Sequence, residues 1–424
     1  MNSLDWIVAA QKSGEARGIP SICSAHPYVL DAALHQGLSA APHRPVLIEA
    51  TCNQVNQFGG YTGMRPADFV KYVYEIADQA GFSHQNLILG GDHLGPLVWS
   101  NEPAESAMEK AKKLVGDYVR AGFGKIHLDC SMPCADDPDL PVEIIARRAA
   151  DLAATAEQAA IEHGFSPRYI IGSEVPSAGG ARAGEEHLVV TKPADAAETI
   201  ARTHQAFSAR GLDAAWERVI GLVVQPGVEY GDEAIHEYDR SAAAGLARLI
   251  ETVPGLVYEA HSTDYQTRSA LRSLVEDHFA ILKVGPGLTF AFRQAVFALA
   301  EMEEILVDRE NSSHVREALE AAMIENPGYW KKYYAASPEE QKFARFYSFS
   351  DRIRYYWPVP GVQAAFERLM SNLTQHPIPL SLVSQYLPQQ YAKIRNGTIK
   401  SHPHTLLLEQ VADVLADYQF ASGD

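Results

Sequence analysis

The chain has 424 residues, of which 46% are hydrophobic and 21% charged, proportions that are typical of a folded globular protein and argue against extended disorder. Its 53 Asp and Glu residues outnumber its 36 Lys and Arg residues and give a formal net charge of −17. A chain this acidic repels phosphate backbones and anionic lipid, so nucleic acid and membrane surfaces are not expected partners.

The N-terminal segment and the cysteines indicate a cytoplasmic protein. The segment MNSLDWIVAAQKSGEARG carries acidic residues and is typical of an amphipathic helix, not of a signal peptide. No run of about 18 apolar residues occurs, so no transmembrane helix is expected. The four cysteines form no CxxC pair and are interpreted as reduced, buried thiols.

Eight short apolar runs predict eight β-strands. In chain order they are PSICSA from Pro20, PVLIEAT from Pro45, NLILGGDH from Asn86, KIHLDCS from Lys125, RYIIGSEV from Arg168, RVIGLVVQPG from Arg218, GLVYEAHSTD from Gly255 and AILKVGPG from Ala280. Each run is rich in Ile, Val and Leu. A continuous apolar run without alternation is typical of a parallel strand that is covered on both faces.

Stretches of helical period separate these runs. They are ADFVKYVYEIADQAG and residues 102–122, 141–164, 193–210, 239–252, 267–278 and 289–307. Alternating strands and helices in this number predict a (β/α)8 TIM barrel of the α/β class. The alternative is an open doubly wound sheet, but such a sheet usually carries a glycine-rich dinucleotide turn after its first strand, and SAHP at that place is not one.

From about residue 308 the strand-like runs stop and the remaining segments have helical period. We therefore predict two units, a barrel with its N-terminal helix over 1–307 and a helical extension packed on it over 308–424. Aromatic residues crowd the extension between 329 and 357. Some of them are expected to pack against the barrel, and a remaining patch could contact another subunit.

In a TIM barrel the ligand site lies where the strands end and the loops to the helices begin. Nearly every predicted strand of this chain ends in a carboxylate, imidazole, amide or ammonium group. These residues are Glu49, Asn53, Gln57, Asp92, His93, Asp129, Ser131, Glu174, Gln225, Glu259, His261, Asp264 and Lys283. Burying so many polar groups at one opening costs several kcal/mol apiece unless they pair, bind a cation or bind a polar ligand. The pattern favours a metal or polyol site over a purely structural network.

His93 and His261 are the first candidates for metal ligands. Each follows an apolar strand and has a carboxylate close by in sequence, Asp92 or Glu259, that can orient its ring. Histidine and carboxylate ligands suit zinc or manganese. The candidates for proton transfer are Asp92, Asp129 and Glu174.

The remaining polar residues at the strand ends are predicted to bind a substrate. They are Asn53, Gln57, Ser131, Gln225, Asp264 and Lys283. The amides can recognise sugar hydroxyls, or they can simply hold a loop together. Lys283 can meet a phosphate, or it can neutralise the acidic opening. The glycine-rich segment 177–184 can close over a ligand with Arg182 facing an anion, or it can be a passive loop.

Nine stretches of the chain resemble the family of the Z-type subunit of class II tagatose-1,6-bisphosphate aldolase. They are ATCNQVNQFGGYTGM, GGDHLGP, HLDCSM, IGSEVP, VVQPGVEYG, YEAHSTDYQ, LKVGPGLTFAFRQA, NPGYWKKYY and RFYSFSDRIRYYWPVP. The resemblance implies a TIM barrel, a role in galactitol or N-acetylgalactosamine-type catabolism, and a non-catalytic subunit that supports a separate catalytic aldolase subunit. Older labels for this family read tagatose-6-phosphate kinase, and some relatives resemble ketose C4-epimerases.

A more distant resemblance, to the catalytic class II aldolases, implies a zinc site. Those enzymes place a zinc-binding histidine after an aspartate on the third strand and further zinc-binding histidines on the sixth and seventh strands. Asp92-His93 and His261 match the first and the last, whereas Gln225 stands on the sixth strand, so one imidazole is missing. The residues that could supply that ligand instead are Glu49, Glu174 and Glu259. The phosphate-binding glycine and serine pattern of that family is also replaced, by Ser262-Thr263-Asp264.

These departures fit two functions. The first is an accessory subunit of tagatose-1,6-bisphosphate aldolase that supports the activity and stability of a catalytic class II aldolase subunit. The second is a metal-dependent ketose or ketose-phosphate C4-epimerase or aldolase in its own right, with one divalent ion. A kinase has least support and no nucleotide is expected, because neither a GxxxxGK[ST] loop nor a kinase-type glycine loop is present. Expected ligands and partners are a ketose or ketose phosphate, the catalytic subunit and a second copy of the chain.

Overall fold

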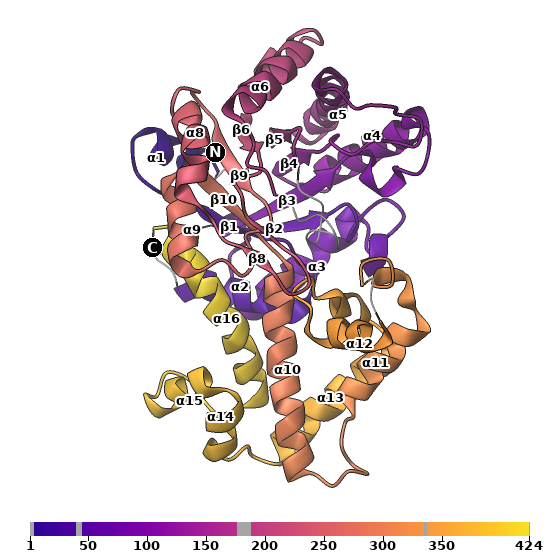
Figure 1. Ribbon diagram of the computed structural model, residues 1–424, viewed down its shortest axis with the longest axis vertical. Coiled ribbons are helices and arrows are strands. Elements are labelled where there is room, and N and C mark those ends of the chain that lie inside the picture. The colour runs from indigo at the N-terminus through magenta and orange to yellow at the C-terminus, as the bar shows by residue number, and fades with distance from the viewer. Residues whose placement is uncertain (1–3, 40–44, 176–187, 335–336, 424) are drawn as a thin grey trace.

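The computed structural model describes residues 4–39, 45–175, 188–334 and 337–423. Eight parallel strands form a closed barrel in the order β1-β10-β9-β6-β5-β4-β3-β2 (Figure 1). The strands are β1 (Ile19–Ile22), β2 (Val46–Thr51), β3 (Leu87–Leu94), β4 (Lys125–Leu128), β5 (Arg168–Gly172), β6 (Val219–Val223), β9 (Val257–Ala260) and β10 (Phe279–Val284). The predicted TIM barrel is confirmed, with a strand at each of the eight apolar runs.

The inside of the barrel has room for polar side chains because some neighbours are small. In the register of β2 and β3, Glu49 lies beside Gly90. A Cβ atom at Gly90 would come within 2.6 Å of Cγ of Glu49, which close packing does not allow without a shift. Gly90 therefore leaves the space in which a fully buried carboxylate lies inside the barrel.

Helices cover the outside of the barrel. They are α1 (Asp5–Lys12), α2 (Pro27–Ser39), α3 (Pro66–Ala80), α4 (Ala104–Arg120), α5 (Val142–His163), α6 (Pro193–Ser208), α7 (Asp213–Trp216), α8 (Arg240–Glu251), α9 (Arg268–Glu276) and α10 (Pro286–Leu306), with the 3-10 turns η1 (Gly60–Thr62), η2 (His84–Asn86) and η3 (Pro96–Trp99). The seven helical stretches predicted from the sequence correspond to α3, α4, α5, α6, α8, α9 and α10. The structure adds α2, α7 and a small hairpin of β7 (Glu229–Tyr230) with β8 (Ile235–His236).

The C-terminal part is helical, as predicted. It contains α11 (Val315–Glu325), η4 (Pro327–Tyr329), α12 (Pro338–Tyr347), η5 (Arg352–Tyr356), α13 (Pro360–Gln375), α14 (Leu380–Tyr386), α15 (Pro388–Arg395) and α16 (Pro403–Ala421). Figure 1 shows α10 running from the barrel into this extension and α16 returning alongside it. Because α16 packs on α2, α9 and α10, a division of the chain near residue 307 remains a prediction.

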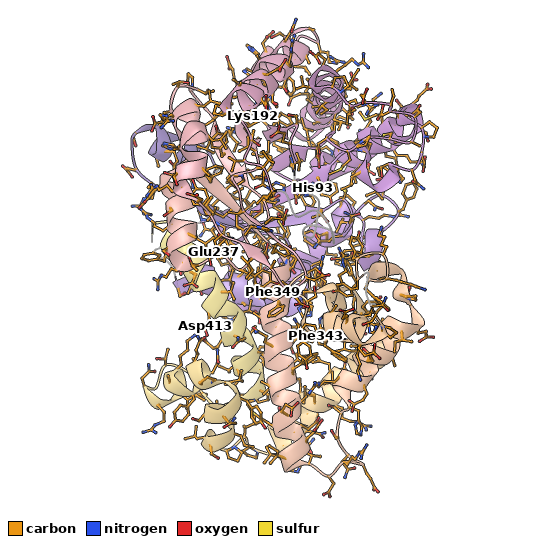
Figure 2. The ribbon with its side chains drawn as sticks, viewed as in Figure 1. His93, Lys192, Glu237, Phe343, Phe349 and Asp413 are labelled. Atoms are coloured by element: carbon orange, nitrogen blue, oxygen red, sulfur yellow. The ribbon has the colours of Figure 1, made fainter. Side chains whose placement is uncertain are left out.

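Specific contacts join the extension to the loops that follow the strands. The Arg293 guanidinium on α10 pairs with the Asp351 carboxylate at 2.8 Å, and both side chains are buried. Phe349, which Figure 2 labels where the extension meets the barrel, donates its N–H to the carbonyl of Asp232. Tyr418 on α16 donates its hydroxyl hydrogen to the carbonyl of Thr263 at 2.8 Å. The extension therefore supports the end of the barrel at which the polar residues gather.

The described part of the chain has no helix that combines the length and the apolar character needed to cross a bilayer. All four cysteines are free thiols. Cys52, Cys130 and Cys134 are buried, as expected, whereas Cys23 is partly exposed at the end of β1.

Candidate functional site

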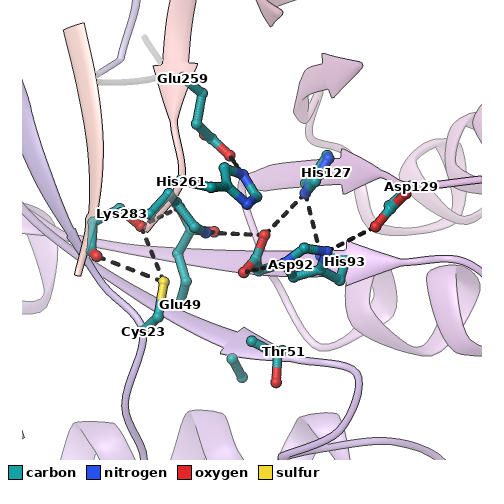
Figure 3. A network of polar contacts seen from close by, with 12 residues as sticks. Cys23, Glu49, Thr51, Asp92, His93, His127, Asp129, Glu259, His261 and Lys283 are labelled. Atoms are coloured by element: carbon teal, nitrogen blue, oxygen red, sulfur yellow. Dashed lines mark hydrogen bonds and ion pairs between the residues drawn. The ribbon is translucent and has the colours of Figure 1, made fainter. Parts of the chain in front are cut away.

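Three imidazoles meet at the end of the barrel where the strands lead into their helices. His93 is on β3, His127 on β4, and His261 directly follows β9 (Figure 3). The ring centroids lie 5.3 Å apart for His93 and His127, 5.0 Å for His93 and His261, and 5.2 Å for His127 and His261. The expectation of a missing imidazole is therefore corrected, because β4 supplies a third one in place of the sixth strand with its Gln225.

His127 was not predicted as a site residue, although a pattern in the sequence indicates its position. The run KIHLDCS places Lys125, His127 and Asp129 two residues apart, and alternate residues of a strand point to the same face. Once Asp129 is assigned to the opening of the barrel, the same face must carry His127 next to it and Lys125 deeper inside.

Each imidazole is hydrogen-bonded to a carboxylate. His93 Nδ1 lies 2.7 Å from Asp129 Oδ2, His127 Nδ1 lies 2.9 Å from Asp92 Oδ1, and His261 Nε2 lies 3.0 Å from Glu259 Oε1. The pairing of His261 with Glu259 is the one suggested by their spacing. Asp92, by contrast, orients His127, and His93 takes its partner from the neighbouring strand. Such partners fix the orientation of a ring and the nitrogen that it presents to the cavity.

Below the imidazoles lies a network of buried ion pairs. The Lys125 ammonium is 2.7 Å from both Glu49 and Glu259. The Lys283 ammonium, which Figure 3 shows beside Glu49 and Asp92, is 2.7 Å from the first and 3.0 Å from the second. Lys283 thus neutralises the acidic opening, one of its two predicted roles. Both oxygens of Glu49 are engaged, so a metal that used Glu49 would have to displace an ammonium group.

The two histidines in the cavity wall, His93 and His261, have pKa values shifted in opposite directions. Burial disfavours the charged form of His93, but the carboxylates of Asp92 and Asp129 outweigh it and raise the pKa of His93 above its ordinary value. Burial lowers the pKa of His261 to about 4, although Glu259 and Asp92 act in the opposite direction. One imidazole therefore favours the protonated form and its neighbour the neutral form, an arrangement that suits acid and base roles.

A cavity of about 90 Å³ opens over these groups. Among the predicted residues, those in its wall are Asn53, Asp92, His93, His261, Asp264 and Lys283. Its wall also contains residues that were not predicted, namely Cys23, Tyr61, Tyr230, Arg354 and Tyr355. Arg354 and Tyr355 belong to η5, so the extension closes one side of the cavity.

Asp264 fills the N-terminal end of α10. Its Oδ1 accepts hydrogen bonds from the N–H groups of Gly285 and Gly287 at 2.9 and 2.7 Å. Burial nevertheless raises the pKa of Asp264 to about 6, because these backbone donors offset only part of the desolvation. A helix N-terminus is a common anion site, and here a side chain of the protein occupies it.

Seven predicted residues do not line the cavity. Glu49, Asp129 and Glu259 take part in the contacts described above, and the other four are Gln57, Ser131, Glu174 and Gln225. The side-chain amide of Gln57 donates to the carbonyl of Lys110, and Gln225 accepts from the backbone of Gly227 and Val228. The exposed Glu174 accepts a hydrogen bond from Thr191, and Ser131 donates to Asp129 at 2.6 Å. These side chains hold loops together, which was the alternative reading of the amides. Segment 177–184, with Arg182, lies outside the described residues.

The buried groups are compatible with a divalent metal. One ligand atom from each of Asp92, His127, Glu259 and His261 lies within 4.8 Å of the others. Nε2 of His127 is buried and has no hydrogen-bond partner, and a neutral imidazole nitrogen of this kind is the commonest metal ligand. The donors thus fit a cation, with Asp92 and His127 where the sequence prediction had His93 and Glu49. The two ring nitrogens of His93 instead face Asp92 and Asp129.

A family model described as D-tagatose-1,6-bisphosphate aldolase subunit GatZ/KbaZ-like matches residues 4–423. The chain belongs to this family. It is 51% identical over 417 residues to the D-tagatose-1,6-bisphosphate aldolase subunit GatZ of Salmonella dublin and 52% identical over 417 residues to that of Klebsiella pneumoniae, and each alignment covers 98% of both chains. The family resemblance read from the motifs is therefore confirmed.

A solved structure from Sinorhizobium meliloti, described as a probable tagatose 6 phosphate kinase, is similar over nearly the whole chain. Its TM-score is 0.87 at 48% sequence identity, and the match covers 96% of this chain and 100% of that one. Barrel and extension thus occur together in a relative of the same length. The two functions in these descriptions, aldolase subunit and kinase, differ, so the choice between them depends on the site.

Proposed function

We propose that this chain is an accessory subunit of a tagatose-1,6-bisphosphate aldolase and supports a separate catalytic class II aldolase subunit in the cytoplasm. The observation that carries the proposal is the full-length similarity, at 51–52% identity, to chains named as subunits of that enzyme. The free cysteines agree with a reducing compartment. A supporting subunit acts through its outer surface, so its effect should not depend on the groups inside the barrel.

The test is a titration of this chain into a purified catalytic class II aldolase subunit. We expect the rate of tagatose 1,6-bisphosphate cleavage and the half-life of the catalytic subunit at elevated temperature to rise and then saturate at a fixed stoichiometry. The matched control is a His93→Gln, His261→Gln double variant, which should give the same rise. Unchanged cleavage and half-life over the whole titration would exclude the accessory role.

A second candidate is a metal-dependent ketose or ketose-phosphate epimerase or aldolase. The observation in its favour is the buried group of imidazoles and carboxylates beneath an open cavity, with the unpaired nitrogen of His127. A single zinc or manganese ion held by Asp92, His127, Glu259 and His261 would act as a Lewis acid on the ketose oxygens. His93 and Asp129 are the pair that can hold and release a proton beside the cavity, because their hydrogen bond favours the imidazolium form.

The second candidate is tested by metal analysis of the purified protein and by assays for interconversion of fructose and tagatose, with and without a 6-phosphate. It requires about one divalent ion per chain and a turnover that His93→Ala abolishes. The control is His84→Ala, since His84 is a partly exposed histidine paired with Asp78. If the purified protein holds no metal and shows no turnover, the accessory role is the one of the two candidates that remains.

We propose that this chain is not a kinase, unlike the description of the Sinorhizobium relative, and that this chain binds no nucleotide. Four buried carboxylates, Glu49, Asp92, Asp129 and Glu259, surround the opening, and both lysines there are already paired with them. A triphosphate needs several uncommitted cations, and the two lysines supply none. Incubation with ATP and tagatose 6-phosphate should therefore release ADP no faster than a blank.

A further inference from the structure

Arg354 lies in the wall between two cavities. The cavity over the imidazoles has a neighbour of about 560 Å³, and the two share Cys23, Gln54, Tyr61, Gly285 and Arg354. Aromatic side chains dominate the larger one, namely Tyr28, Tyr72, Phe292, Trp357 and Phe366. A ligand that extended from the larger cavity to the imidazoles would therefore pass the guanidinium of Arg354.

Arg354 forms no ion pair with a carboxylate of the described residues. Asp351 and Asp264 are near enough to act on its charge, but each of these carboxylates is held by other donors. The hydrogen bonds of Arg354 go to neutral acceptors, the carbonyls of Ser350 and Asp351 and the hydroxyl of Tyr355 at 2.8 Å. Within the described ranges, no carboxylate oxygen lies within 4.0 Å of its guanidinium nitrogens. The carboxylate of Asp351 is held by Arg293 and by Thr289.

The other cation in the smaller cavity is in a different situation. Lys283 is paired with both Glu49 and Asp92. A guanidinium always carries its charge and has five N–H donors, of which the hydrogen bonds of Arg354 use three. Two N–H groups in the wall of a cavity therefore remain for a ligand.

A second place for an anion in this cavity is already taken. The first N–H groups of α10 point to Asp264, whose carboxylate accepts from Gly285 and Gly287. A phosphate cannot use these donors unless it displaces that carboxylate. Among the residues that the structure describes, Arg354 combines a charge without an ion pair with a position in the wall of both cavities.

We infer that Arg354 binds the phosphate of a ketose phosphate whose sugar end lies at the imidazole cluster. The inference takes a ketose ligand from the function proposed above and adds the phosphate and the extension residue that recognises it. A guanidinium and a phosphate form two parallel charge-assisted hydrogen bonds, and the removal of water from the partly enclosed cavity strengthens them.

Calorimetric titration of the purified full-length chain tests the inference. The probes are tagatose 6-phosphate, tagatose, inorganic phosphate, and tagaturonate as a carboxylate in place of the phosphate. We expect tagatose 6-phosphate to bind about 10- to 100-fold more tightly than tagatose. Inorganic phosphate should compete with tagatose 6-phosphate, a result that needs no variant. If tagaturonate binds as tightly as tagatose 6-phosphate, the site recognises a carboxylate as well as a phosphate, and the inference is overturned.

Two substitutions identify the residue. Arg354→Met should bring the affinity for tagatose 6-phosphate down to that for tagatose, and Arg354→Lys should retain part of the preference because it keeps the charge without the fork. The matched control is Arg395→Met, since Arg395 is an exposed arginine that also donates to a tyrosine, Tyr391, at 2.9 Å. Thermal unfolding of each variant identifies any that fails to fold.

The role of Arg354 and the accessory role are tested by different measurements, so that either can fail without the other. The accessory role is measured as the activity and half-life of the catalytic subunit, whereas the phosphate preference is measured on this chain alone. An unchanged preference in folded Arg354→Met, or no binding of any probe to the wild type, would overturn the role of Arg354. Neither result would affect the accessory role.

Discussion

Two buried groups of charges in this protein differ in how they are balanced. Inside the barrel, Lys125 and Lys283 lie within 3.0 Å of Glu49, Glu259 and Asp92, so that each charge has a partner of opposite sign. In the wall that the extension contributes, Arg354 donates to neutral oxygens. In the network every charge has a partner, and Asp92 and Glu259 keep their ammonium partners whether or not a metal is bound. Arg354, in contrast, has no ion pair among the described residues. We therefore expect the network to stabilise the fold and Arg354 to take part in recognition.

The largest expected effect comes from breaking the balanced network. Lys125→Met leaves Glu49 without one of its ammonium partners and Glu259 without its closest one, and an uncompensated buried charge costs about 3–5 kcal/mol of the free energy of unfolding. Urea denaturation measures this loss. The control is Lys112→Met, since Lys112 lies in a surface ion pair with Glu109 and should change stability by no more than about 0.5 kcal/mol. Equal effects of the two changes would mean that the network does not stabilise the fold.

The space around the network is tested at Gly90. Gly90→Ala places a methyl group 2.6 Å from Glu49 Cγ, and such overpacking of a core costs about 1–3 kcal/mol. The comparison is Gly116→Ala on α4, where the new Cβ meets only the flexible end of Arg120 within 3.0 Å and the higher helix propensity of alanine should offset the contact. Urea denaturation of both variants under the same conditions compares their free energies of unfolding. A larger loss for Gly90→Ala than for Gly116→Ala would show that Glu49 is tightly packed against Gly90.

The pH dependence of stability separates a neutral buried group from the charged ones. Burial lowers the pKa of His26, beside the larger cavity, to about 3. Since the unfolded chain takes up this proton near pH 6.5 and the folded chain only near pH 3, His26 lowers stability as the pH falls through that window. His26→Phe keeps the ring and should lose less stability between pH 7 and pH 5, by up to about 2 kcal/mol. Asp264 titrates near pH 6 in both proteins, so its opposite contribution cancels.

The smallest effect is expected in the unbalanced region. Arg354→Met removes hydrogen bonds to neutral acceptors, which are worth about 1 kcal/mol, but it also removes a charge that forms no ion pair with the described residues. The free energy of unfolding without ligand should therefore change by about 1 kcal/mol or less. A loss as large as that of Lys125→Met would show that Arg354 is a structural residue and would remove the contrast between the two regions.

The order of elements could be predicted from the sequence because it depends on local patterns. Continuous apolar runs located all eight strands, and the strand ends located Asp92, His93 and His261 in one cavity. Position at a strand end does not determine where a side chain points, and for this reason Gln57 bonds to α4 and Gln225 to its own loop. The polar residues within the runs, Lys125 and His127, were missed because an apolar run conceals the residues that face the inside of a barrel.

The contribution of the extension was beyond sequence reasoning for a different reason. The contacts of η5 with the cavity join residues near 54–61 with residues near 354, and no periodic pattern encodes a contact over such a separation. The motif RFYSFSDRIRYYWPVP supports the family resemblance, but its aromatic residues predict packing against the barrel and no role in the cavity. Arg354 differs from Arg345, which pairs with Glu320, and from the exposed Arg395, because it combines the lack of an ion pair with a place in the wall of two cavities. That combination is a property of the folded state.

The position of α16 has a consequence for folding during synthesis. This helix follows all eight barrel strands in the chain, and its Tyr418 donates to the carbonyl of Thr263, next to Asp264 and close to His261. Domains begin to fold while translation continues, so the eight strands can assemble before this contact exists. A nascent barrel would therefore lack this support, at the end where its polar residues gather, until α16 has been synthesised.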